Sequence, residues 1–483
     1  MESSLKDKTV RGASWSFIDN FVTIGITFVV SIILARILSP EEFGLIGIIT
    51  IFISVFNSIV DCGFSSALIR KTNIRNIDYS TIFIFNIVFS VLLAALLCVC
   101  SPLIANYFGQ TELDLLLKIM SVIVIINGVS IVQNTILVRN IDFKTQARNS
   151  LIASFISGVV SIVLALFGFG VWSLAIQQIL KQLINSIMLW GFTTWRPKFE
   201  FSVSSFKEQF SFGWKLLMSG IIDTIWNEIY TVVIGKCYSA ATLGQYSKSV
   251  QFKNLFSNNL TFIVQRVYYP MLSSIKDDHD KLLEISRRVT KATMFVAIML
   301  MLFVSATSDE IILTLIGDKW LDAAKYLRII SLYGMLFPLQ SMNLDLLKVK
   351  GRSDIHLYLE IAKKIIGIGP IMLGVLINIE AMLWGSVIYN VINFFLNSYF
   401  VGREMGYTSV LQIRDLMPSF ILGALMYACV YSVSFMPFAP FIVLSIQIIV
   451  FISVILLIGE SFNVNAYVEV KELLIYYYNK FKK

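Results

Sequence analysis

Apolar segments of about 20 residues follow one another along nearly the whole chain, and this repetition limits the fold more than any other feature. A helix of that length crosses the hydrocarbon core of a bilayer. Lys and Arg are concentrated in every second connection between the segments, which is typical of membrane proteins with basic cytoplasmic loops. The sequence therefore predicts an all-α integral membrane protein with about 14 transmembrane helices.

The predicted spans cover most of the chain. They are 14–37, 44–68, 79–104, 114–137, 149–168, 171–192, 211–235, 243–271, 289–308, 322–346, 355–377, 381–401, 416–435 and 439–459. Because both ends of the chain are basic, as are the alternate loops, we expect the N-terminus and the C-terminus to be cytoplasmic. The net charge of +8 lies in short loops beside apolar spans, so it predicts membrane orientation and no nucleic-acid binding.

Motifs for chemistry are missing from the sequence. The five cysteines form no CxxC pair, and His279 and His356 are far apart, so neither a metal site nor a disulfide framework is predicted. The sequence contains no GxSxG, HExxH or GxxxxGK[ST] pattern. We therefore expect no catalytic residues, no cofactor and no direct use of ATP, which leaves coupling to H⁺ or Na⁺ open.

Two parts of the sequence match each other at an offset of 200 residues. Residues 31–44, SIILARILSPEEFG, align with 231–244, TVVIGKCYSAATLG. At a slightly larger offset, GVWSLAI at 170–176 resembles AMLWGSV at 381–387. The pattern predicts an internal duplication of six spans each, with both copies in the same orientation. The expected domains are an N-terminal six-helix lobe (1–200), a C-terminal six-helix lobe (201–413) and two further helices with a basic tail (414–483).

The segment 243–271 is unusually polar for a span. Polar residues recur at helical spacing and would share one face, namely Gln245, Lys248, Gln251, Asn258, Thr261 and Gln265. Such a helix either lines a wet cavity or lies on the membrane surface, and the alternation of basic loops favours the cavity.

Polar side chains within the spans are the best candidates for a substrate or ion pathway, because ionisable groups in a bilayer are costly. On the seventh span Lys215, Ser219, Asp223 and Asn227 step by four along one face. The predicted pathway residues are Asp61, Lys181, Lys215, Asp223, Asn227, Glu228, Lys253, Asn258 and Arg266. The alternative is static ion pairing, for example of Asp223 or Glu228 with Lys215 or Lys253, and snorkelling of residues such as Arg266.

The first 71 residues carry a recognisable series of short motifs. Leu34-Ala35-Arg36, Leu38-Ser39-Pro40, Glu42-Phe43-Gly44 and Asp61-Cys62-Gly63-Phe64 occur in this order. This stretch resembles the polysaccharide-transporter, or Wzx-type flippase, branch of the multidrug/oligosaccharidyl-lipid/polysaccharide exporter superfamily. We expect the Leu38–Gly44 turn to be structural, with Pro40 ending one helix and Gly44 helping to start the next.

The resemblance implies a V-shaped, MATE-like pair of six-helix lobes in a bacterial cytoplasmic membrane. The implied cargo is an oligosaccharide on undecaprenyl pyrophosphate, used for O-antigen, capsule or exopolysaccharide. The implied partners are this lipid-linked oligosaccharide and membrane lipids, together with a polysaccharide polymerase and glycosyltransferases. Two alternatives stay open, namely a cation-coupled multidrug exporter of the same fold and a non-transporting membrane component of polysaccharide assembly.

Overall fold

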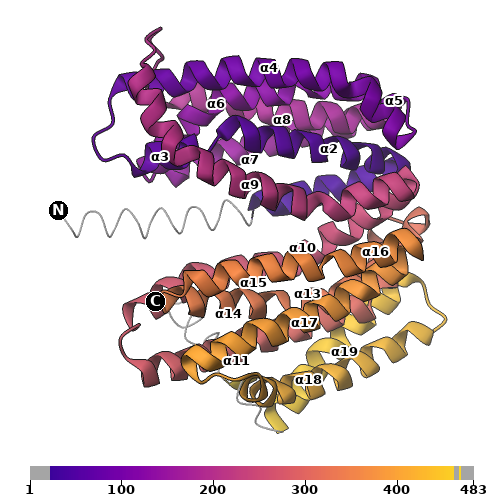
Figure 1. Ribbon diagram of the computed structural model, residues 1–483. Coiled ribbons are helices and arrows are strands. Elements are labelled where there is room, and N and C mark those ends of the chain that lie inside the picture. The colour runs from indigo at the N-terminus through magenta and orange to yellow at the C-terminus, as the bar shows by residue number, and fades with distance from the viewer. Residues whose placement is uncertain (1–21, 462–466, 469–470, 472–483) are drawn as a thin grey trace, which may run out of the picture. The chain divides into compact units, whose positions relative to one another are not determined.

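The computed structural model describes residues 22–461, 467, 468 and 471. These residues form helices joined by short connections and contain no β-strand (Figure 1). The chain divides into two compact units, Met1–Gly244 and Gln245–Lys483.

In the first unit a helix over Val22–Ile37 precedes α2 to α9. These are α2 (Pro40–Asp61), α3 (Phe64–Arg70), α4 (Asn76–Phe108), α5 (Glu112–Met120), α6 (Val122–Arg139), α7 (Phe143–Leu166), α8 (Val171–Phe192) and α9 (Val203–Cys237). Neighbouring pairs include α7 with α8, α4 with α6, and α2 with α9. Helix α10 (Ala240–Ser274) begins at the end of this unit and continues into the second.

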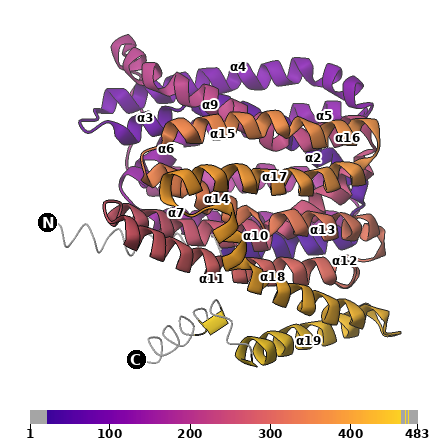
Figure 2. The same cartoon turned by 60° about the horizontal axis from the view of Figure 1, so that its bottom comes forward.

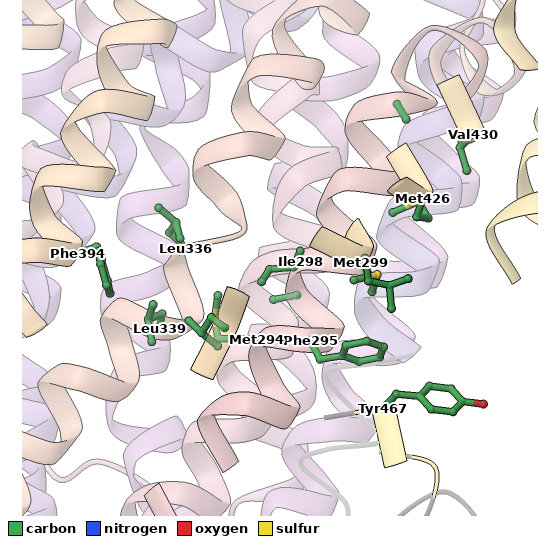
Figure 3. Packing of buried hydrophobic residues seen from close by; sticks show 14 residues of the cluster. Met294, Phe295, Ile298, Met299, Leu336, Leu339, Phe394, Met426, Val430 and Tyr467 are labelled. Carbon is green, nitrogen blue, oxygen red and sulfur yellow. The ribbon is translucent and has the colours of Figure 1, made fainter. Parts of the chain in front are cut away.

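The second unit contains α11 to α19. They are α11 (His279–Ala306), α12 (Ser308–Leu315), α13 (Leu321–Gly334), α14 (Phe337–Val349), α15 (Ser353–Ile366), α16 (Ile368–Leu376), α17 (Ile379–Met405), α18 (Ser409–Ser432) and α19 (Pro440–Ser461). Helix α18 packs against α11, and α19 against α12 and α18 (Figure 2). One cluster of buried side chains joins α11, α14, α17 and α18, with Met294, Ile298, Leu339, Phe394 and Met426 among its members (Figure 3).

All-helical structure is confirmed for the described residues, but the number of crossings stays a prediction. Eight helical segments are long and apolar enough to cross a membrane, whereas fourteen spans were predicted. Each predicted span nevertheless falls on a helix or on two consecutive helices, except that residues 14–21 of the first lie outside the described residues. The six predicted spans outside these eight segments are the first, which is described only from Val22, and those on α8, α9, α10, α13 with α14, and α15 with α16, whose helices carry several polar or charged side chains.

The division into compact units does not follow the expected repeat boundary near residue 200. Helix α9 packs on α2, α3 and α4, so it belongs to the first unit. Contact between helices and descent from a duplication are separate properties, and the duplication stays a prediction.

The Leu38–Gly44 turn forms the capped start of α2. Ser39 and Glu42 make a reciprocal capping box, in which the Ser39 amide donates to Glu42 Oε2 at 2.6 Å and the Glu42 amide donates to Ser39 Oγ at 3.4 Å. Pro40 is the first residue of α2, where its missing N–H costs nothing, so it starts this helix and does not end the preceding one. Gly44 is buried inside α2 and not at its start, and its backbone lies against that of Ala240.

Gly44 of α2 and Gly244 of α10 both lie where the backbone of the other helix leaves no room for a side chain. A Cβ on Gly44 would lie 1.8 Å from the Ala240 carbonyl oxygen, and a Cβ on Gly244 would lie 1.8 Å from the Pro40 carbonyl oxygen. The starts of α2 and α10 therefore cross with their backbones in contact, and neither glycine can carry a side chain there.

The Asp61–Phe64 motif breaks the second predicted span. Cys62 and Gly63 both have positive φ, and Asp61 Oδ1 accepts from the Ser65 amide at 3.3 Å and from Ser65 Oγ at 2.5 Å, which caps α3. Phe64 is fully buried, with its ring near Phe85. The motif thus ends α2, redirects the chain and anchors α3.

Candidate functional site

The polar stripe predicted on the seventh span is present on α9. Lys215, Ser219, Asp223 and Asn227 are all exposed, while the opposite face packs on α2, α3 and α4. Glu228, one residue further, is half-buried and accepts a hydrogen bond from Thr231. An uncovered polar stripe on a helix of this length is unsuited to hydrocarbon and suits water or a polar ligand.

The other face of α9 is tied closely to the first unit. A Cβ on Gly213 would lie 2.5 Å from the Cys62 carbonyl oxygen, so the α9 backbone lies against the break between α2 and α3. Lys71 Nζ pairs with Glu208 of α9 at 2.8 Å and with Asp78 of α4 at 3.2 Å. Burial acts to lower the pKa of Lys71, but its hydrogen bonds to these two carboxylates outweigh that effect and raise it.

A second group of polar residues forms hydrogen bonds between α6 and α8 inside the first unit. Ser130 Oγ donates to Ser186 Oγ at 2.7 Å, Gln182 Nε2 donates to Asn127 Oδ1, and Trp190 Nε1 donates to the Val129 carbonyl at 3.2 Å. These hydrogen bonds satisfy polar groups between helices, which is the usual role of such residues in membrane bundles.

Helix α10 packs against α13 and α14 of the second unit, and this packing favours a helix within the bundle over one on the membrane surface. Part of its polar face hydrogen-bonds to neighbouring helices. Gln245 Nε2 donates to the Lys319 carbonyl at 2.7 Å, and Gln265 Nε2 donates to Asp345 Oδ2 at 3.0 Å. Ser249 and Ser257 donate to the carbonyls of Ala323 and Gly334 at 2.8 and 2.6 Å.

Lys253 and Asn258 are the predicted site residues that the structure brings into contact. Lys253 Nζ donates to Asn258 Oδ1 at 3.3 Å, and it lies 5.6 Å from the Tyr333 ring centroid and 5.9 Å from that of Phe337. The Lys253 residue is only 8% exposed. In the described part of the second unit, no carboxylate lies within ion-pair distance of this ammonium group.

The aromatic neighbours of Lys253 flank a helix break. The tenth predicted span is divided at Met335 and Leu336 into α13 and α14, and Gly334 lies on its N-terminal side. Ser257 satisfies the Gly334 carbonyl, and a Cβ on Gly334 would lie 3.0 Å from Lys253 Cγ. Interrupted helices of this kind form binding sites in many transporters, because the break exposes polar backbone groups.

The remaining predicted residues lie elsewhere. Asp61 caps α3, and Arg266 is exposed with its guanidinium carbon 4.2 Å from the Phe262 ring centroid. Lys181 is partly buried on α8. Asp61 therefore has a structural role that its sequence position alone did not indicate.

A set of buried amides in the second unit was missed. Asn390, Asn393 and Asn397 lie at i, i+3 and i+7 on α17, and Gln340 of α14 donates to Asn390 Oδ1 at 3.0 Å. Asn343 of α14 and Gln412 of α18 exchange hydrogen bonds of 3.0 and 3.1 Å. The helical spacing of the three asparagines in an apolar span was the available signal.

More than half of the chain matches a known protein family. Residues 33–325 match the family described as polysaccharide biosynthesis protein. The chain belongs to this family. The match includes the Ser39–Glu42 cap, the Asp61–Phe64 break, α9 and the pair Lys253 and Asn258, and it ends before Tyr333 and Phe337.

Relatives of the chain have been named for polysaccharide assembly. The teichuronic acid biosynthesis protein TuaB of Bacillus subtilis (strain 168) is 26% identical over 438 residues, covering 89% of this chain and 90% of the relative. The succinoglycan biosynthesis transport protein ExoT of Rhizobium meliloti (strain 1021) is 26% identical, covering 80% and 79%. The lipopolysaccharide biosynthesis protein WzxC of Escherichia coli (strain K12) is 26% identical, covering 82% and 81%.

Solved structures support the fold assignment. The lipid II flippase MurJ in an inward closed conformation has a TM-score of 0.73 at 16% identity, covering 94% of this chain and 98% of that one. A multidrug resistance MATE family transporter in an inward-facing conformation has a TM-score of 0.61 at 14% identity, covering 79% and 95%. The chain is thus a multi-pass membrane protein with the fold shared by these transporters.

Proposed function

We propose that the chain is a flippase that moves an oligosaccharide linked to undecaprenyl pyrophosphate across the bacterial cytoplasmic membrane by alternating access. Family membership and the names of its relatives support this proposal. The sugar head group needs a polar route because its hydroxyls would lose their water partners in hydrocarbon. Fourteen spans, two cytoplasmic termini and coupling to H⁺ or Na⁺ belong to the same proposal.

The main structural observation in support of an anionic cargo is the buried Lys253 ammonium group. A lysine at the centre of a bilayer costs about 2.5–3.5 kcal/mol, so a protein retains one when it has a use for the charge. Its neighbours include an amide and two aromatic rings, none of which neutralises it. A pyrophosphate would supply the opposite charge and accept a charge-assisted hydrogen bond. This arrangement suits an anionic cargo better than the cationic drugs of a multidrug exporter.

A flipping assay with matched lysine variants tests the proposal. The protein is reconstituted in vesicles with a fluorescent undecaprenyl-pyrophosphate sugar, and transfer between leaflets is followed by a membrane-impermeant quencher. We expect Lys253→Gln to slow flipping about tenfold or more, the loss of one hydrogen bond to a charged group. Lys325→Gln is the control, because Lys325 is an exposed lysine of the same unit that pairs with Asp322.

Other results would count against the proposal. Normal flipping by a folded Lys253→Gln protein would remove this residue from the pathway. Absence of flipping by the native protein, together with export of cationic dyes that depends on Glu228, would instead support the multidrug exporter.

We also expect Asp223→Ala to slow flipping in the same assay, because Asp223 lies on the exposed polar stripe of α9.

A further inference from the structure

The connection between α8 and α9 presents large apolar side chains outward. Phe199 is 101% exposed, Phe201 49% and Val203 58%. Phe199 lies at the tip of a tight turn, in which the Glu200 amide donates to the Lys198 carbonyl at 2.8 Å. A fully exposed Phe at the tip of a turn needs an apolar environment that the protein itself does not provide.

This connection is held firmly on both sides. The Lys198 amide donates to Ser80 Oγ at 3.2 Å and the Ser202 amide donates to Thr81 Oγ1 at 3.1 Å, so both are tied to the start of α4. Arg196 donates to the carbonyl of Thr193 at 2.6 Å and to that of Trp190 at 2.9 Å, which ties it to the last turn and C-cap of α8. The turn therefore holds Phe199 in an outward position, and little conformational entropy remains to be lost on binding.

Aromatic residues around the connection place it at the edge of the hydrocarbon core. Trp195 packs against Tyr79 and Phe83 with ring centroids 5.7 and 5.8 Å apart, and Trp190 packs against Phe83 at 5.6 Å. Trp and Tyr concentrate at membrane interfaces. Helix α4, with 33 residues, is about 50 Å long, which exceeds a core of about 30 Å, so it extends beyond the hydrocarbon core at one or both ends.

The exposed basic residues beside these aromatic residues are typical of a segment at the cytoplasmic face of a membrane. Arg196 and Lys198 are exposed within the connection, and Lys207 is exposed in the first turns of α9. Basic residues near the surface are attracted to anionic lipid headgroups. In Figure 1 the chain before α9 projects at the end of the bundle where α3 lies.

We infer that residues 195–203 form an interfacial anchor, which inserts Phe199 and Phe201 among the acyl chains of the cytoplasmic leaflet while Lys198 contacts an anionic phospholipid headgroup. The anchor is separate from the pathway residues on α9 and α10 and does not depend on the identity of the cargo. It fixes the start of α9 relative to the membrane surface through α4.

Site-specific photo-crosslinking tests the anchor in the full-length protein. Benzoylphenylalanine replaces Phe199, Phe201 or, as the water-exposed control, Asp277, and each protein is reconstituted in an equal mixture of phosphatidylcholine and phosphatidylglycerol. After irradiation, intact-mass spectrometry measures the lipid adduct. We expect several-fold more adduct at the two phenylalanine positions than at Asp277, with phosphatidylglycerol captured in excess of phosphatidylcholine.

A second variant tests the headgroup contact. Lys198→Gln should abolish the preference for phosphatidylglycerol and leave the total adduct at Phe199 unchanged. Capture of a protein instead of lipid, or equal adduct at Phe199 and Asp277, would overturn the anchor. An unchanged lipid preference in the Lys198→Gln protein would overturn the role of Lys198. Melting temperatures equal to that of the native protein exclude misfolding as the cause of either result.

Discussion

Single residues at the Asp61–Phe64 turn show how a short motif can be structural in a transporter. Gly63 has a φ of 68°, and its missing side chain allows α9 to lie against the turn at Gly213. A Cβ at Gly63 would lie 2.7 Å from the Gly213 carbonyl oxygen, which belongs to the backbone and cannot move independently. The residue thus meets two requirements at once, one of conformation and one of space.

We expect Gly63→Ala to be clearly more destabilising than Gly109→Ala. Both glycines have a φ of 68°, but a Cβ on Gly109 would meet no atom within 4 Å. Gly109→Ala should cost about 1–2 kcal/mol from backbone strain alone. Gly63→Ala should cost about 1–3 kcal/mol more, because the α9 backbone must shift. Thermal unfolding in detergent measures both, and equal losses would show that the contact with Gly213 adds nothing.

The sequence predicts which polar residues share a helix face where their own helix determines their position. The stripe Lys215, Ser219, Asp223 and Asn227 follows from helical spacing alone and is uncovered in the structure. Gln245 and Gln265 were assigned to the same face as Asn258, but they hydrogen-bond to α13 and α14 or their connections. That outcome depends on which helices become neighbours, and spacing within one segment carries no such information.

Helices were predicted more reliably than their interruptions. Runs of apolar residues located the spans, yet the break at Met335 and Leu336 has no glycine or proline within it, although Gly334 and Pro338 lie nearby. Whether such residues interrupt a helix depends on whether its neighbours satisfy the freed backbone groups. Here Ser257 of α10 does so for the Gly334 carbonyl, and this contact spans 77 positions in the sequence.

An ion pair connects α18 to α11 in addition to the apolar cluster between these helices. Arg287 donates from Nε and Nη2 to the two carboxylate oxygens of Asp415, each at 2.8 Å, and Tyr407 donates to the same carboxylate at 3.2 Å. The Asp415 side chain is only 9% exposed. Such a two-point contact fixes the relative orientation of its helices as well as joining them.

We expect Asp415→Asn to lower the stability of the protein by about 2 kcal/mol, because it leaves a guanidinium group without its charged acceptor. Exchange of the two residues, Arg287→Asp with Asp415→Arg, should restore part of the loss. Asp322→Asn removes the exposed pair with Lys325 and should change stability by less than about 1 kcal/mol. Thermal unfolding of the four proteins gives the comparison, and a loss from Asp322→Asn as large as that from Asp415→Asn would contradict it.

At the scale of the whole molecule, a duplication predicts pairs of equivalent contacts. The match at an offset of 200 residues pairs Pro40 with Ala240 and Gly44 with Gly244. Gly44 lies against Ala240, and Gly244 lies against Pro40. Each contact therefore pairs a residue of one copy with the counterpart of its neighbour in the other copy. Ser239 also accepts from the Thr242 amide at 3.1 Å, as Ser39 does from the Glu42 amide at 3.4 Å. Reciprocal contacts of this kind are expected between two copies of one ancestral segment, and the duplication stays a prediction.

We therefore expect Gly44→Ala and Gly244→Ala to have equal effects that do not add. Each new Cβ would lie 1.8 Å from a carbonyl oxygen of the other helix, so each variant must separate the starts of α2 and α10, at about 1–3 kcal/mol. Once one substitution has moved the helices apart, the second meets less resistance, and the pair should show a coupling of about 0.5–3 kcal/mol. Gly25→Ala, whose Cβ would meet no atom within 4 Å, is the control and should not destabilise the helix. Thermal unfolding of the single and double variants measures the coupling. Unequal single losses, or a double variant whose loss equals their sum, would mean that the two glycines are not equivalent.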